Sequence, residues 1–83
     1  MSQRDKLIKA ICRNPKDVRF DDACKVAEWL GFTAKERGGT SHCVYARPGE
    51  PELLNFQERS NGLIKPYQAK QLVGMIEKYE DEL

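Results

Sequence analysis

The spacing of the apolar residues changes twice along the chain, and this restricts the folds that the chain can adopt. Over residues 3–13 and 21–30, apolar side chains recur at the spacing of amphipathic helices that bury one face. Between residues 32 and 57, glycines and prolines interrupt short apolar segments, which is typical of strands joined by turns. Helical spacing returns over residues 66–80. The predicted order is therefore helix, helix, three strands, helix.

Proline and glycine residues mark where the helices begin and end. Asn14-Pro15 ends the first helix, because the residue before a proline disfavours the helical conformation. Gly31 fits the C-terminal cap of the second helix, with Phe32 folding back on its last turn. Pro66 suits the first turn of the last helix, where the missing N–H of proline is no loss.

Short turns between the three strands indicate how the strands pair. The predicted strands cover residues 32–37, 42–47 and 53–57, and the turns lie at Gly38-Gly39 and at residues 48–51. Because short turns join antiparallel neighbours, we expect a three-stranded antiparallel sheet. Helices packed on one face of such a sheet make an α+β sandwich of two layers.

The length and composition favour one soluble domain. A chain of 83 residues has room for a single core, so we expect one domain over residues 1–83. Apolar residues make up 40% and charged residues 33%, and no apolar run approaches the roughly 20 residues of a transmembrane helix. With no signal pattern at its N-terminus, the chain is expected to be cytoplasmic, without a membrane partner. Cys12, Cys24 and Cys43 show no CxxC spacing and are expected to be reduced, mostly buried thiols.

The single histidine, His42, follows the small-residue turn Gly39-Thr40-Ser41 at the start of the second predicted strand. Imidazole has an unperturbed pKa of about 6.5, so it can take up and return a proton near neutral pH. A lone histidine at such a position is more often an ordinary surface side chain than a catalytic one. With one histidine, no carboxylate cluster at ligand spacing and no glycine-rich phosphate loop, the sequence predicts no metal and no cofactor.

Basic residues lie around His42 in the predicted sheet and at the start of the last helix. They are Lys35, Arg37, Arg47, Lys65 and Lys70. Because the net charge is only +1, attraction to a polyanion must come from such local clustering. These cations could bind a phosphodiester, which suits RNA better than a small metabolite, although a solvated surface explains them equally well.

Glycine and tyrosine residues near these cations have two interpretations each. Gly39 serves as a turn residue and could also let an RNA backbone approach closely. Tyr45 and Tyr67 could stack on bases, but packing against the core is more common for aromatic residues at such positions. Along the second strand, the period of two places His42, Val44 and Ala46 on one face, and Cys43, Tyr45 and Arg47 on the other.

Several of these motifs, taken in order, resemble the HicA toxins of prokaryotic toxin–antitoxin pairs. The first is the glycine-bearing turn before His42, followed by Val44-Tyr45 and Arg47-Pro48. Residues 16–20 and 29–32 are similar to the family's first conserved helix, and residues 62–72 are similar to the lysine-proline start of its final helix. The resemblance covers nearly the whole chain and rests on the order and spacing of the motifs together.

This resemblance implies a double-stranded-RNA-binding-like fold and an endoribonuclease that cleaves messenger RNA, silenced by a HicB-like antitoxin protein. It also implies that His42 is catalytic, and we expect a general base that acts on the ribose 2′-hydroxyl. Such a reaction needs no metal and leaves DNA intact. Many members have histidine where this chain has Cys43 and Gln57, so the general acid is unassigned among Tyr45, Lys35 and water.

Two other functions fit the same residues. One is an RNA-binding module without catalysis, in which Lys65 and Lys70 bind phosphates across a groove. The other is a protein-interaction domain whose basic face docks on an acidic partner. A HicB-like partner is compatible with all three functions, since it would cover His42 and the surrounding cations.

Overall fold

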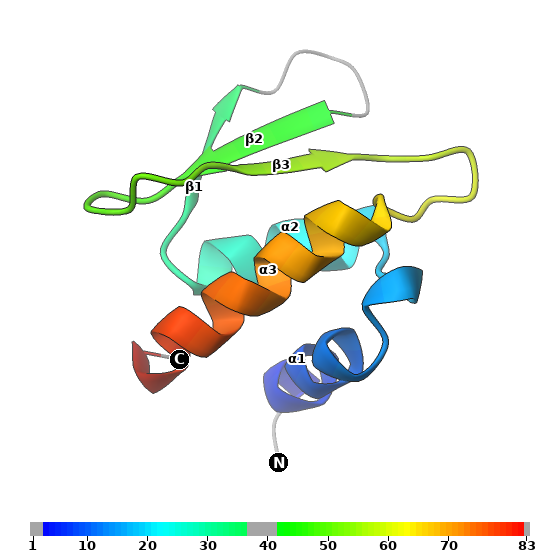
Figure 1. Cartoon of the computed structure of the whole chain (residues 1–83), viewed down its shortest axis with the longest axis horizontal. Coiled ribbons are helices and arrows are strands. Elements are labelled where there is room, and N and C mark those ends of the chain that lie inside the picture. Colours follow the sequence, from blue (N-terminus) through cyan, green and yellow to red (C-terminus); the bar gives the residue numbers. More distant parts are fainter. Residues whose placement is uncertain (1–2, 37–41, 83) are drawn as a thin grey trace.

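The computed structural model in Figure 1 describes residues 3–36 and 42–82 of the chain. These residues form the helices α1 (Gln3–Arg13), α2 (Phe20–Trp29) and α3 (Pro66–Tyr79) and the strands β1 (Thr33–Glu36), β2 (His42–Ala46) and β3 (Leu54–Gln57). Two short 3-10 helices, η1 (Pro15–Asp17) and η2 (Glu80–Glu82), were not predicted. The predicted α+β class and the order α-α-β-β-β-α are confirmed.

The three strands form one antiparallel sheet in the order β1-β2-β3. In the pairing of β2 with β3, His42 lies opposite Gln57 and Tyr45 lies opposite Leu54. The pairing of β1 with β2 contains an irregularity between Ala34 and Glu36. Helices α2 and α3 cover one face of the sheet, as Figure 1 shows, so the sandwich arrangement is as predicted.

The side chains of the sheet alternate between this helical layer and the opposite face. Cys43, Tyr45, Leu54 and Phe56 are buried, whereas Val44 and Ala46 are half-buried. The alternation expected for the second strand is therefore confirmed for these residues. The largest fully buried side chains come from the sheet, from both covering helices and from the segments beside them: Val26, Phe32, Tyr45, Leu54, Phe56, Ile64 and Leu72.

Helix α2 ends at a glycine, as predicted. Gly31 has a φ of 91°, and its N–H donates to the carbonyl of Glu28 at 3.0 Å. The N–H of Phe32 donates to the carbonyl of Ala27, also at 3.0 Å. This pair of bonds is a Schellman motif, which needs a residue that tolerates positive φ at the position of Gly31. It turns Phe32 back into the core, where Phe32 is 1% exposed.

A tight turn joins β2 to β3. The N–H of Glu50 donates to the carbonyl of Arg47 at 3.0 Å, and Gly49 has a φ of 85°. A proline followed by a glycine of positive φ makes a type II turn, with Pro48 and Gly49 as its central residues. The turn predicted at residues 48–51 is confirmed.

Helix α1 lies on the side of the molecule away from the sheet, where it packs against α3 and η1 (Figure 1). The guanidinium carbon of Arg4 lies 4.8 Å from the ring centroid of Trp29, so a cation–π contact also joins α1 to α2. Trp29 takes part in helix packing, as expected. None of the described helices is long and apolar enough to cross a membrane.

The three cysteines are free, and they differ in exposure. Cys24 and Cys43 are buried, as expected, but Cys12 on α1 is exposed. Partial burial and the nearby carboxylates of Glu77 and Glu80 raise the pKa of the Cys12 thiol. Its sulfur is therefore protonated near neutral pH.

The fold depends on the face of α3 that meets the sheet. Leu72 is 0% exposed, so Leu72→Ala leaves a cavity and should lower the free energy of unfolding by about 2–5 kcal/mol. The adjacent Gln71 is exposed, and Gln71→Ala should change it by less than about 0.5 kcal/mol. Denaturant unfolding of both variants checks this, and equal stabilities would contradict the assigned orientation of the helix.

Candidate nucleic-acid interface

The predicted catalytic residue lies at one end of the sheet. The backbone of His42 begins β2 and pairs with Gln57, the last residue of β3. The side chain of His42 lies outside the part of the structure that is described, and so do the predicted RNA contacts Arg37 and Gly39. The surroundings of this strand end are therefore defined by residues of β3 and α3.

The side chain of Gln68 joins this end of the sheet to the start of α3. Its Oε1 atom accepts the N–H of Gln57 at 3.0 Å and the N–H of Lys65 at 3.3 Å. Gln68 is 3% exposed, and a buried amide oxygen with two backbone donors holds both backbone segments in place. The start of β2 is thereby joined, through Gln57 and Gln68, to the residue that precedes α3.

Three of the predicted cationic contacts are described near this end of the fold. Lys65 is half-buried and immediately precedes α3, while Lys70 is exposed on its second turn. At 1.5 Å of rise per residue, Lys70 begins about 6 Å along the helix axis from Pro66. Lys35 is exposed on the edge strand β1, beside Glu36, whose backbone pairs with Val44 two residues from His42.

Arg47 lies at the other end of β2. With about 3.3 Å per strand residue, it is about 16 Å from His42 along the strand. Its Nε atom donates to the carbonyl of Leu30 at 3.0 Å, and its guanidinium lies 3.9 Å from the ring centroid of Tyr79. A phosphate beside His42 is therefore out of reach of Arg47. The period of two in the sequence had placed Arg47 on the face of Tyr45, which is the face covered by helices.

Tyr45 and Tyr67 have opposite environments. Tyr45 is 0% exposed; its hydroxyl donates to Oε2 of Glu28 at 3.3 Å, and its ring packs 5.9 Å from that of Phe56. It faces the helices, so it is unsuited to be the general acid and cannot stack on a base. Tyr67 is 58% exposed, which corrects the expectation that it packs in the core.

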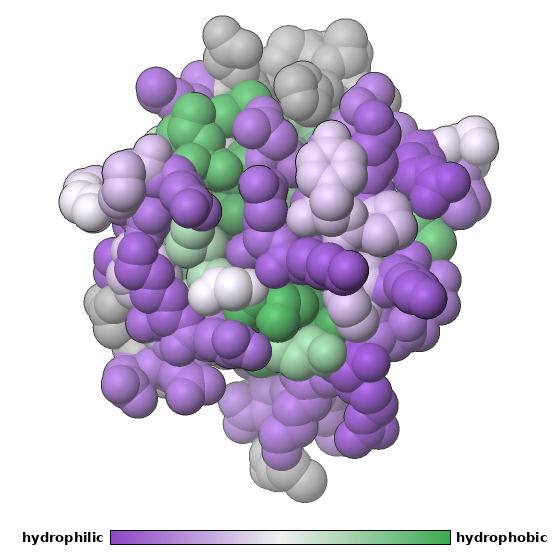
Figure 2. All heavy atoms as spheres, viewed as in Figure 1, coloured by the Kyte–Doolittle hydropathy of each residue, from purple (hydrophilic) through white to green (hydrophobic). Residues whose placement is uncertain are grey.

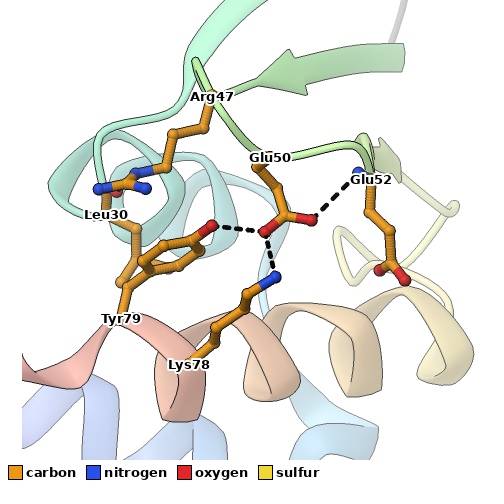
Figure 3. Close-up of polar contacts among 6 residues, drawn as sticks. All are labelled: Leu30, Arg47, Glu50, Glu52, Lys78 and Tyr79. Carbon is orange, nitrogen blue, oxygen red and sulfur yellow. Dashed lines mark hydrogen bonds and ion pairs between the residues drawn. The ribbon is translucent and has the colours of Figure 1, made fainter.

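A second polar cluster, formed by Glu50, Lys78, Tyr79 and Arg47, lies at the opposite end of the fold and was not predicted. Figure 3 shows the carboxylate of Glu50 pointing toward α3, where Oε1 accepts hydrogen bonds from Lys78 Nζ at 2.6 Å and from the hydroxyl of Tyr79 at 2.5 Å. Its Oε2 accepts the N–H of Glu52 at 3.1 Å. The side chain of Glu50 is 1% exposed, and protein donors satisfy both oxygens. This cluster joins the β2–β3 turn to the end of α3.

No spacing in the sequence connects Glu50 with Lys78, because they are 28 positions apart. The contact follows from the antiparallel course of β3 and α3, which returns the end of the helix to the turn. The cluster offers no accessible polar atom of Glu50 to a ligand, so we assign it a structural role. In the described residues, no three His, Cys, Asp or Glu side chains lie close enough together to hold a metal ion.

Comparisons of the chain with protein-family models, with curated proteins and with solved structures gave no match.

The Glu50 cluster makes stability depend on acid pH. Hydrogen bonds first from Lys78, then from Tyr79, lower the pKa of Glu50 from 4.5 to about 2. Because the folded state binds this proton more weakly than the unfolded chain, the stabilisation is complete above pH 4.5 and is lost as the pH falls toward 2. The free energy of unfolding, measured by denaturant titration across this range, should fall more in the wild type than in Glu50→Gln.

Glu52→Gln is the matched control for that measurement, since it removes an exposed carboxylate two residues along the chain. We expect the control to keep the acid dependence of the wild type. Identical curves for wild type and Glu50→Gln would show that the cluster does not form in solution.

Proposed function

We propose that the protein is a cytoplasmic endoribonuclease of the HicA toxin type, which cleaves messenger RNA without a metal. The single observation that carries the proposal is the pair of hydrogen bonds to Gln68. Through Gln57, these bonds connect the strand end that bears His42 to the start of α3, where Lys65 and Lys70 lie. A proton acceptor at the head of a strand and cations at the head of the adjoining helix suit a phosphodiester.

The reaction we propose is transesterification within the RNA strand. His42 takes the proton from a ribose 2′-hydroxyl, and the 2′-oxygen forms a bond to the adjacent phosphorus as the P–O5′ bond breaks. The 5′-oxygen leaves with its electron pair and receives a proton, which gives a 2′,3′-cyclic phosphate and a 5′-hydroxyl end. DNA lacks the attacking hydroxyl and resists cleavage.

The proton for the leaving oxygen has two remaining sources. Tyr45 is excluded because its side chain is fully buried and its hydroxyl donates to Glu28 on α2. Lys35 is exposed on β1, and water is the other source. A Lys35→Ala variant that keeps the wild-type rate would leave water as the acid.

The partner we propose is a HicB-like antitoxin that covers His42 and the cations at this end of the sheet. Silencing by contact suits the small size of the domain, since a partner that covers one end of the sheet also blocks access of RNA to the start of α3. A neighbouring reading frame encoding such a chain is an independent observation that would support the pairing.

Replacement of the histidine tests the catalytic assignment. Loss of a general base lowers a rate by about 10²–10⁴-fold, so we expect His42→Ala to cut RNA that much more slowly and to relieve growth arrest on expression. Gel analysis of RNA with and without EDTA, and of the same RNA with a 2′-deoxy substitution at the cleaved position, measures this. Equal cleavage by His42→Ala, or cleavage of the deoxy substrate, would refute the mechanism.

A non-catalytic RNA-binding module is the second candidate. It is favoured by the run α2-β1-β2-β3-α3, the element order of double-stranded-RNA-binding domains, and by the two lysines at the start of α3. It predicts RNA binding that survives His42→Ala and no cleavage products after long incubation.

Both candidates predict that RNA binding weakens with salt through Lys65 and Lys70, and the leading candidate binds a single strand. If Lys65 and Lys70 each neutralise one phosphate, alanine at either position should reduce the slope of log K against log salt by about 0.7 for a single strand. Lys25→Ala, which removes an exposed cation from α2, should leave the slope unchanged. Absence of RNA binding by the wild type at low salt would exclude both candidates and favour a protein-interaction domain.

A further inference from the structure

An exposed aromatic ring lies beside the lysines at the start of α3. Tyr67 is the second residue of that helix and is 58% exposed, whereas the neighbouring Gln68 and Ala69 face the interior. In the described part of the chain, large hydrophobic side chains are exposed only at Leu53 and Tyr67. The face drawn in Figure 2 is mainly hydrophilic, with smaller apolar areas between the hydrophilic residues. The ring of Tyr67 is thus an apolar surface that the fold itself leaves uncovered.

Cations flank this ring along the chain on both sides. The Nζ atom of Lys65 lies 6.0 Å from the ring centroid of Tyr67, at the limit of a cation–π contact. Lys70 follows Tyr67 by three residues, which puts the two side chains on neighbouring parts of the helix surface. The position of the group is fixed, because the N–H of Lys65 is bound to Gln68 and Gln68 also binds the end of β3.

An uncovered aromatic ring between two amines matches one kind of ligand: a planar base with a phosphate on either side. The face of a base is accessible only where the strand is unpaired, since bases in a duplex are covered by their neighbours in the stack. We propose that Tyr67 stacks on one base of a single-stranded RNA segment, while Lys65 and Lys70 bind the adjacent phosphates. This inference rests on the proposed function and specifies its substrate as unpaired RNA.

Tyr67 is a positioning residue in this account. Stacking at the start of α3 places the bound RNA next to Gln68. The RNA then also lies near the first residue of β2, His42, because Gln68 binds the residue that pairs with it. The nucleotide that stacks fixes which ribose lies beside His42. We therefore expect unpaired segments to be cleaved in preference to paired ones, with base stacking contributing to the choice of position.

Equilibrium binding isolates the stacking contact from cleavage. The probe is a short, fluorescein-labelled, unstructured RNA whose riboses carry 2′-O-methyl groups, so that the strand stays intact. Because a stacked base contributes about 1–3 kcal/mol, Tyr67→Ala should weaken binding by about 5- to 150-fold, whereas Tyr67→Phe keeps the wild-type affinity. Tyr67→Leu preserves apolar area without the ring face and should behave like alanine. Thermal unfolding of the three variants confirms that each remains folded.

A second arm removes the base instead of the ring. A series of probes carries one abasic site at successive positions, and the wild type should lose affinity at one position in the series. Tyr67→Ala should be insensitive to the abasic site at that position, because the stacking partner is already absent. As a control, an RNA hairpin in which the same sequence is base-paired should be bound equally well by the wild type and by Tyr67→Ala.

The outcomes separate this inference from the proposed function. Wild-type binding with no effect of Tyr67→Ala, or an equal effect on paired and unpaired RNA, overturns the stacking role and leaves the RNA site standing. Unchanged RNA affinity would then favour a protein contact for the exposed ring. Absence of any RNA binding by the wild type at low salt overturns both.

Discussion

The amide oxygen of Gln68 is the contact on which the arrangement of the candidate site depends. It is buried, and it binds one backbone N–H from the end of β3 and one from the residue before α3. Movement of the strand end or of the helix start breaks one of these two hydrogen bonds, and each bond contributes about 0.5–1.5 kcal/mol to stability. A loop of residues 58–64 separates the two segments in sequence, yet one side chain fixes their relative position.

The elements could be predicted from the sequence because the signals for them are local. Pro15, Gly31, Gly49 and Pro66 mark boundaries through their own backbone preferences, and the observed elements begin or end within one or two residues of those predicted. What could not be predicted depends on contacts between distant segments. The bridge between Arg19 and Leu63 and the bond between Glu50 and Lys78 exist only after the chain has folded.

The candidate site was predicted in part for the same reason. Proximity in sequence suggested that Arg47 and His42 act together. They lie at opposite ends of an extended strand, however, and the guanidinium of Arg47 contacts the ring of Tyr79 instead. Lys65 and His42 are 23 positions apart in the sequence, and the β2–β3 pairing with the bond to Gln68 brings their backbones to one end of the fold. Tyr45 is buried and Tyr67 is exposed, a difference that the residue type alone could not predict.

Helix α3 is fastened to the β2–β3 hairpin at both of its ends, by Gln68 at the first turn and by Glu50 at the last. Its 14 residues span a fixed length of about 21 Å, which sets the distance between the two contact points on the hairpin. If β3 shifted by one residue against β2, the buried and outward side chains would exchange faces. At least one of the two contacts, at Gln68 or at Glu50, would then be lost. A mispaired hairpin would therefore lose contacts at both ends of α3. The register that places Gln57 opposite His42 is the one in which α3 can pack with both contacts formed.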